Sequence, residues 1–274
     1  MTLAFLRRAA ASLAFLAFAI PASATSTGID YTDQWWGGQN ESGWGVNFIE
    51  QGTTIFATLF VYGQDQTPRW FVATMNPSDG TNTNFGGSLA ATTGPYYGGT
   101  WDPNLVHATV VGTMSVNFSN AYEGTMSYVA NGVAVTKPIV RQTFKFNNLG
   151  GSYLGGMTAN ATSCKNGATN GTALIFGGLV VTQSIQQVSM VVSFYNGAGA
   201  ASQCTYNGNL GGQGVMGQIV NGTFSCVVGG TTQNAGTFNL DNATMTQSGF
   251  SGLFTGIDQY CNYSGYFGGV KDVQ

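Results

Sequence analysis

Apolar and polar residues alternate along most of this chain, and the alternation is densest between residues 35 and 72. Within this stretch Trp44, Val46 and Phe48 fall on one face of a short run, and two further alternating runs follow. Successive side chains of a β-strand point to opposite faces, so a period of two over short runs predicts half-buried strands. Turn residues such as Gln51-Gly52 separate the runs. The stretch is therefore predicted to form an antiparallel meander in which Trp44 is buried.

The alternation returns in three later runs, at residues 108–118, 122–129 and 133–144. Asn131-Gly132 joins the last two, and this dipeptide favours the tight turn of a β-hairpin. A weaker run at 85–92 brings the total to about seven strands, without one convincing helical segment. An open sheet of this size would leave two unpaired edges, and closure into a barrel removes both.

A polar, glycine-rich segment at residues 147–151 separates this block from a second alternating block. Eight short runs at nearly regular spacing are typical of an up-and-down barrel. We therefore predict an all-β fold of two antiparallel meander barrels, or barrel-like sandwiches, in tandem. The domains are a Trp-rich one over residues 25–148 and a Gly-rich, cysteine-bearing one over residues 149–274. The eight runs of the second block are 152–162, 171–182, 185–195, 202–210, 214–227, 235–245, 249–256 and 260–270.

Residues 1–24 have the features of a cleaved secretory signal peptide. Arg7 and Arg8 precede an apolar run over residues 9–20, and Pro21-Ala22-Ser23-Ala24 has the small residues of a cleavage site. The run is shorter than the roughly 20 apolar residues that cross a bilayer. We therefore predict an exported protein, either periplasmic or secreted to the cell surface or beyond.

Charge excludes one class of partner. Charged residues make up only 7% of the chain, against about 25% in ordinary soluble domains. Removal of Arg7 and Arg8 leaves 6 basic residues against 11 acidic ones, a formal net charge of −5 (6 − 11). Such a chain has no basic surface for a phosphate backbone, so we do not expect nucleic acid as a partner.

The signal and the strands also fit an outer-membrane barrel, and two observations argue against that interpretation. The chain ends in Lys271-Asp272-Val273-Gln274 rather than on an aromatic, lipid-facing strand. Many runs also have few apolar residues on the face that would meet lipid. We therefore do not predict an integral membrane protein.

The four cysteines all lie in the second block and none forms a CxxC pair, which argues against a zinc site. In an exported protein an even number of cysteines usually forms disulfides. In the eight-strand barrel, strands four and five are neighbours, and closure places strand eight beside strand one. This arrangement predicts Cys204–Cys226 and Cys164–Cys261, since disulfides need closely spaced Cα atoms. The rival pairing, Cys164–Cys204 with Cys226–Cys261, would require a flattened barrel or a different strand count.

The first block contains the motifs Trp35-Trp36, Glu41-Ser42-Gly43-Trp44-Gly45, Phe56-Ala57, Phe60, Tyr62, Pro68 and Trp70. By these motifs it resembles a family of uncharacterised exported bacterial proteins. The resemblance covers roughly residues 30–146 and includes the later stretches VVGTMSVNF and KPIVRQTF. Where the family often has Asn-Pro after the tryptophan pair, this chain has Gly37-Gly38-Gln39-Asn40. The resemblance implies an exported β domain, and the family has no established activity to carry over.

Few residues have the pattern of a catalytic or metal site. His107 is the only histidine and no G-x-S-x-G stretch occurs, which argues against a Ser-His-Asp hydrolase. A pair of carboxylates could hydrolyse a glycoside without histidine, but linear spacing does not show which two acids face each other. We predict no catalytic residue, no metal ligand and no cofactor. The acids embedded among aromatic residues are Glu41, Glu50, Asp102 and Glu123.

Aromatic residues in predicted loops carry the functional hypothesis. Rings in such positions either pack over a barrel end as a plug or stack on sugars and apolar ligands. The favoured interpretation is a non-catalytic module that binds a glycan or small apolar ligand at an aromatic-lined barrel end. The alternatives are a carboxylate-based hydrolase of extracellular polysaccharide and a structural or adhesion module. The predicted contact residues are Trp35, Trp36, Trp44, Trp70, Tyr97 and Trp101, with Glu41 and Arg69 as polar orienters.

Overall fold

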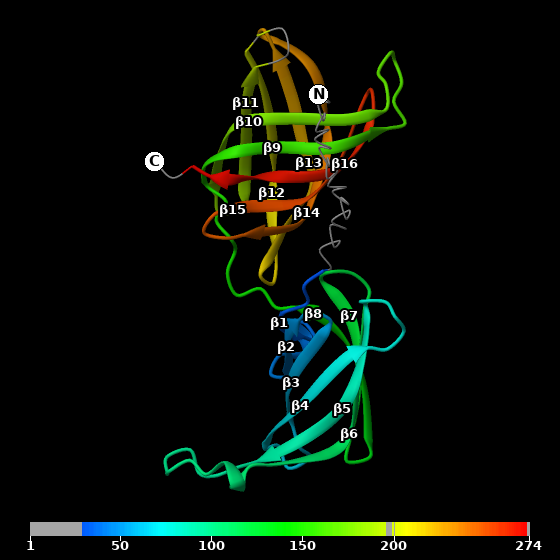
Figure 1. Cartoon of the computed structure of the whole chain (residues 1–274), viewed down its shortest axis with the longest axis vertical. Coiled ribbons are helices and arrows are strands. Elements are labelled where there is room, and N and C mark those ends of the chain that lie inside the picture. Colours follow the sequence, from blue (N-terminus) through cyan, green and yellow to red (C-terminus); the bar gives the residue numbers. More distant parts are fainter. Residues whose placement is uncertain (1–28, 196–198, 200, 273–274) are drawn as a thin grey trace, which may run out of the picture.

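The chain folds into two closed, eight-stranded antiparallel barrels joined end to end (Figure 1). The computed structural model describes residues 29–195, 199 and 201–272. The predicted signal peptide, residues 1–24, lies outside the described residues. The prediction of two tandem all-β barrels is confirmed. Within the described ranges, the chain forms no helix with the length and apolar content needed to cross a bilayer.

The first barrel is a simple meander in which each strand pairs with the next one along the chain. It closes where Trp35 of the first strand pairs with Arg141 of the last. Two short 3₁₀ turns, η1 (Gln39–Glu41) and η2 (Pro103–Leu105), interrupt the loops. The β5–β6 hairpin extends beyond the barrel wall (Figure 1). The strands of the first barrel are β1 (Asp33–Trp36), β2 (Gly45–Gln51), β3 (Thr54–Tyr62), β4 (Pro68–Pro77), β5 (Asn84–Thr93), β6 (His107–Phe118), β7 (Glu123–Ala130) and β8 (Val133–Arg141).

The second barrel repeats this topology with longer strands, and its closure pairs the last strand with the first along their whole length. Its strands are β9 (Gly151–Thr162), β10 (Gly171–Ser184), β11 (Gln187–Tyr195), β12 (Ala201–Gln213), β13 (Met216–Val228), β14 (Thr231–Met245), β15 (Gly249–Asp258) and β16 (Asn262–Lys271). In β9 and β11 alternate residues are buried along most of the strand, as the period-two pattern predicted.

Aromatic rings fill the interior of the first barrel. Tyr31 stacks on Phe118 with ring centroids 3.7 Å apart, and Trp35 lies 5.0 Å from the same phenylalanine ring. The Trp35 side chain has no exposed area, and its indole N–H donates to the Tyr31 carbonyl. Trp35 is therefore a core residue, which corrects its assignment to a ligand-contact surface.

Both disulfides join the pairs that the eight-strand arrangement predicted. Cys204 and Cys226 face each other on β12 and β13. Cys164, just after β9, is bonded to Cys261, just before β16, so this bridge fastens the two strands that close the barrel. Two disulfides indicate that the protein folds in an oxidising, extracytoplasmic compartment.

The two barrels touch through the turn between β12 and β13. The backbone N–H of Val215 donates to Asp33 Oδ2 over 2.7 Å, and that of Gly214 donates to Thr143 Oγ1 over 2.8 Å. A second contact joins the N–H of Asn242 to the Tyr122 hydroxyl over 2.8 Å. Backbone N–H groups of the second barrel thus hold it against one end of the first barrel.

Leu149 lies at the predicted boundary between the two domains. Leu149 is fully buried in the core of the second barrel. Its carbonyl accepts a hydrogen bond from the Tyr153 hydroxyl, and its N–H donates to Gln183. By its contacts, Leu149 therefore belongs to the second barrel.

Loss of the closure disulfide is expected to cost more stability than loss of the internal one. The chain separation is 97 residues for Cys164–Cys261 and 22 for Cys204–Cys226. Loop-closure entropy then gives losses of about 5 and about 3 kcal/mol for the two alanine double variants. Denaturant unfolding of the oxidised variants measures both values. Equal losses, or the reverse order, would contradict an entropic role for barrel closure.

Gly214→Ala is expected to separate the barrels while leaving each one folded. Gly214 has φ 65°, and a Cβ there would collide with the Asp33 carboxylate. The collision should break the hydrogen bond from the Val215 N–H to the Asp33 carboxylate. Loss of this bond to a charged acceptor should expose the linker between β8 and β9 about tenfold more often. Trypsin cleavage after the exposed Lys145 reports this exposure. Gly229→Ala is the matched control, because Gly229 has φ 56° with open space around its added Cβ. Equal cleavage of the two variants would contradict the contact.

Candidate functional site

The structure distributes the eight predicted contact residues over several parts of the first barrel. Glu41 and Trp44 do come together: the Trp44 indole N–H donates to Glu41 Oε2 over 3.0 Å. Lys137, which the sequence did not single out, forms an ion pair with Glu41 Oε1 at 2.7 Å and lies 6.0 Å from the Trp44 ring. The hydrogen bond from Lys137 holds the pKa of Glu41 below its usual value. Trp44 is half-buried against the core, less deeply than its predicted strand position implied.

Trp70 lies on the outer wall of the first barrel. It pairs across the sheet with Phe60, and the two side chains are 54% and 46% exposed. Trp36 is half-buried at the end of β1. The Arg69 guanidinium forms a surface ion pair with Asp65 at 2.8 Å.

Tyr97 and Trp101 lie in the loop between β5 and β6. Tyr97 is 90% exposed and Trp101 is 63% exposed. The Tyr97 ring is 4.8 Å from its neighbour Tyr96. Because Trp35 is buried in the core, the eight residues do not all belong to one exposed aromatic surface.

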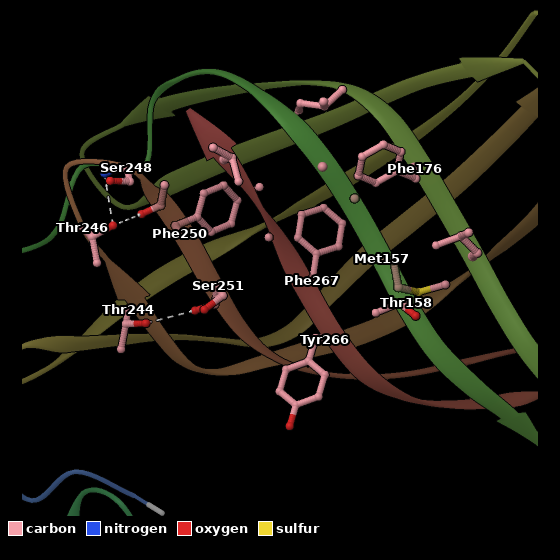
Figure 2. Close-up of a pocket in the computed structure, with 18 residues that line it drawn as sticks. Met157, Thr158, Phe176, Thr244, Thr246, Ser248, Phe250, Ser251, Tyr266 and Phe267 are labelled. Atoms are coloured by element: carbon pink, nitrogen blue, oxygen red, sulfur yellow. Dashed lines mark hydrogen bonds between the residues drawn. The ribbon is translucent and has the colours of Figure 1, made fainter. Parts of the chain in front are cut away.

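An apolar groove lies on the outside of the second barrel. We call it the outer groove; its volume is about 520 Å³ (Figure 2). Exposed apolar side chains form its walls, and the turn between β14 and β15 closes one end. Its residues are Leu154, Gly155, Gly156, Met157, Thr158, Leu174, Phe176, Thr244, Thr246, Ser248, Gly249, Phe250, Ser251, Tyr266, Phe267, Gly268, Gly269 and Val270.

Paired glycines make the floor of the outer groove. Gly156 of β9 lies between Gly268 of β16 and Phe176 of β10 in the sheet register. A Cβ at Gly156 would collide with the Ile175 carbonyl, and one at Gly268 would collide with the Phe250 carbonyl. Only glycine allows the backbones of adjacent strands to approach so closely. The floor is therefore bare backbone between walls of side chains.

The outer groove contains no charged side chain among its residues. The hydroxyl groups of Thr244 and Thr246 lie near the β14–β15 turn, where they form local hydrogen bonds (Figure 2). Thr246 Oγ1 donates to the Gly249 carbonyl over 3.2 Å and accepts from the Ser248 N–H over 3.2 Å. Thr244 Oγ1 donates to the Ser251 carbonyl over 3.4 Å. The remaining surface is apolar, which suits an uncharged ligand.

The four acidic residues named as candidates for hydrolysis lie outside the outer groove. Glu41 is bonded to Trp44 and Lys137, as described above, and the other three acids also accept hydrogen bonds. Glu50 accepts from the Tyr31 N–H over 2.8 Å, and Asp102 accepts from the Asn104 N–H over 2.9 Å. Glu123 accepts from the Asn120 amide over 3.4 Å. No group of three or more metal-ligating side chains occurs within the described part of the chain.

No protein-family model, curated protein or solved structure matches this chain. The function therefore has to be argued from the geometry of the second barrel. The sequence did contain a signal for the outer groove. Gly155-Gly156 and Gly268-Gly269 are double glycines in the two strands that barrel closure brings together.

Gly268→Ala is expected to destabilise the second barrel by about 1–3 kcal/mol, because its Cβ meets the backbone of β15. Gly178→Ala is the control, because Gly178 lies in β10, which also borders the outer groove. A Cβ at Gly178 meets nothing, and the substitution should be neutral or stabilise by up to about 1 kcal/mol. Thermal and denaturant unfolding compare the two. Similar losses in both variants would contradict the close backbone approach.

Proposed function

We propose that this protein is an exported, non-catalytic binding module that takes an uncharged, mainly apolar small molecule in the outer groove. One observation carries the proposal: a concave surface of about 520 Å³ whose residues include no charged side chain. Ligand sites of proteins typically have volumes of about 300–1,000 Å³ and mainly apolar linings. An exposed apolar hollow on a soluble domain also commonly marks a binding site.

The walls favour a particular ligand shape. Leu154 and Val270 are 56% and 67% exposed on one side of the glycine floor, and Leu174 and Tyr266 are 67% and 55% exposed on the other. A flat or extended apolar body could lie on the backbone floor and bury these side chains. Burial of apolar area contributes about 25 cal/mol per Å². The hydroxyl groups near the turn would suit a polar end of the same ligand.

Export supports the same proposal. The two disulfides require an oxidising compartment, and the resemblance of the first block to exported bacterial proteins agrees with this. We propose a periplasmic or secreted location after removal of residues 1–24. A glycan is the less favoured ligand, because Phe176 and Tyr266 are the only aromatic side chains of the exposed walls.

Thr158→Trp should weaken the binding of an uncharged apolar dye. Thr158 is an exposed outward residue of the outer groove, so an indole there fills the space without entering the core. Nile red fluorescence titration of the mature protein should give saturable binding at one site, weakened at least about tenfold by Thr158→Trp. Thr162→Trp, exposed on the same strand outside the groove, should bind like the wild type.

Two results would overturn the proposal. Equal dye binding by both tryptophan variants would place the dye elsewhere. Absence of dye binding together with saturable binding on a glycan array, blocked by Thr158→Trp, would replace the apolar ligand with a sugar.

A further inference from the structure

A second hollow lies inside the second barrel, toward the end that carries the disulfides. We call it the inner pocket; its volume is about 180 Å³. It shares Met157 and Leu174 with the outer groove, and its other residues face the barrel interior or its rim. Aromatic rings make much of its lining: Tyr206, Phe224, Phe254 and Tyr263.

Small residues on adjacent strands leave this space open. Ala159 of β9 pairs with Ala173 of β10 on one side and with Gly265 of β16 on the other. All three positions point inward, so three neighbouring strands place no large side chain at this level. Tyr206 lies below, fully buried, with its ring 4.8 Å from that of Phe267.

A hydrogen-bonded carboxylate lies beside the rim of the inner pocket. Asp258 Oδ1 accepts the N–H groups of Tyr260 and Cys261 over 2.6 and 2.7 Å, and Oδ2 accepts the Tyr263 hydroxyl over 2.9 Å. Burial would raise the pKa of Asp258, but these bonds and one from the Asn234 amide together hold it below its usual value. Asp258 therefore acts as a charged acceptor.

This carboxylate decides the orientation of Asn234. The Asn234 amide lies beside the Asp258 carboxylate and the Tyr263 oxygen, and its hydrogen bonding acts to lower the pKa of both groups. Rotation of the amide by a half turn would place its oxygen against a carboxylate that can only accept. Asn234 Oδ1 is thus held away from Asp258, and it is buried without a hydrogen-bond partner among the described residues. A buried acceptor of this kind is costly unless a donor reaches it.

We propose that the inner pocket binds a small, uncharged aromatic molecule whose N–H or O–H group donates to Asn234 Oδ1. The site combines an apolar lining with one unpaired acceptor, which is how ligand pockets fix orientation. Its size suits a molecule of one or two fused rings, since a protein cavity of about 150 Å³ holds benzene. The barrel mouth is the entry, because Ala173, Asn234 and Tyr263 are partly exposed there.

The test compares indole with indene, which has the same fused-ring shape and no N–H donor. Isothermal titration of the disulfide-bonded mature protein should show indole binding at least about tenfold tighter, because indene leaves the buried acceptor unpaired. Equal affinity for the two compounds would overturn the role of Asn234. Absence of indole binding would overturn the proposal that the inner pocket is a ligand site.

Two variants locate the binding site. Ala173→Leu places a larger side chain in the inner pocket and should abolish indole binding. Thr172→Leu, at the adjacent exposed position of β10, should leave binding unchanged. Unchanged indole binding by Ala173→Leu would overturn the proposal. Circular dichroism verifies that both variants are folded.

The outer groove is tested separately from the inner pocket. Thr158 lines only the outer groove and Ala173 only the inner pocket. Thr158→Trp should therefore block Nile red and leave indole binding unchanged, and Ala173→Leu should do the opposite. Loss of indole binding in Thr158→Trp, at unchanged stability, would overturn a separate inner site.

Discussion

The buried guanidinium of Arg141 is the interaction on which the arrangement of the two barrels depends. Its side chain has no exposed area, and it donates to the carbonyls of Asp30, Thr32 and Ala121 and to the Asp33 carboxylate. Burial lowers the pKa of Arg141, while Asp33 opposes this shift. A buried charge is tolerated only when it is paired and hydrogen-bonded. Arg141 therefore requires three segments of the first barrel to be in place together: the chain before β1, the β6–β7 loop and the last strand, β8.

The same charge connects barrel closure to the contact between barrels. Arg141 pairs with Trp35 across the closing strands and lies 4.9 Å over its indole ring. Asp33 neutralises Arg141 with Oδ2 at 3.1 Å, and the same oxygen accepts the Val215 N–H from the second barrel. Because one carboxylate serves both contacts, the closure of the first barrel also creates the acceptor that receives the second.

The two barrels share a topology and differ in how they use the interior. The first fills it with stacked rings such as Tyr31 and Phe118, which leaves little room for a ligand. The second has alanine and glycine at inward positions near the disulfide end, and glycine pairs across its outer wall. The second barrel also carries both disulfides, which stabilise it by restricting the unfolded chain. Space for ligands and covalent closure therefore occur in the same barrel.

The sequence by itself determined the all-β class, the tandem barrels and the disulfide pairing. These follow from period-two alternation, from turn residues and from the order of strands, all of which are local or set by a simple meander. Cys164 and Cys261 illustrate this, since closure alone makes their strands neighbours.

Tertiary structure decided what each side chain does. Trp35 and Trp36 are adjacent and chemically identical, yet one is in the core and the other is not, because neighbouring residues of a strand face opposite sides. The ion pair of Lys137 with Glu41 joins residues 96 positions apart, and no local pattern contains it. The glycine floor and the unpaired Asn234 oxygen likewise depend on which residues of distant strands come into register. Register across a closed barrel is a property of the whole sheet, and it places the candidate sites.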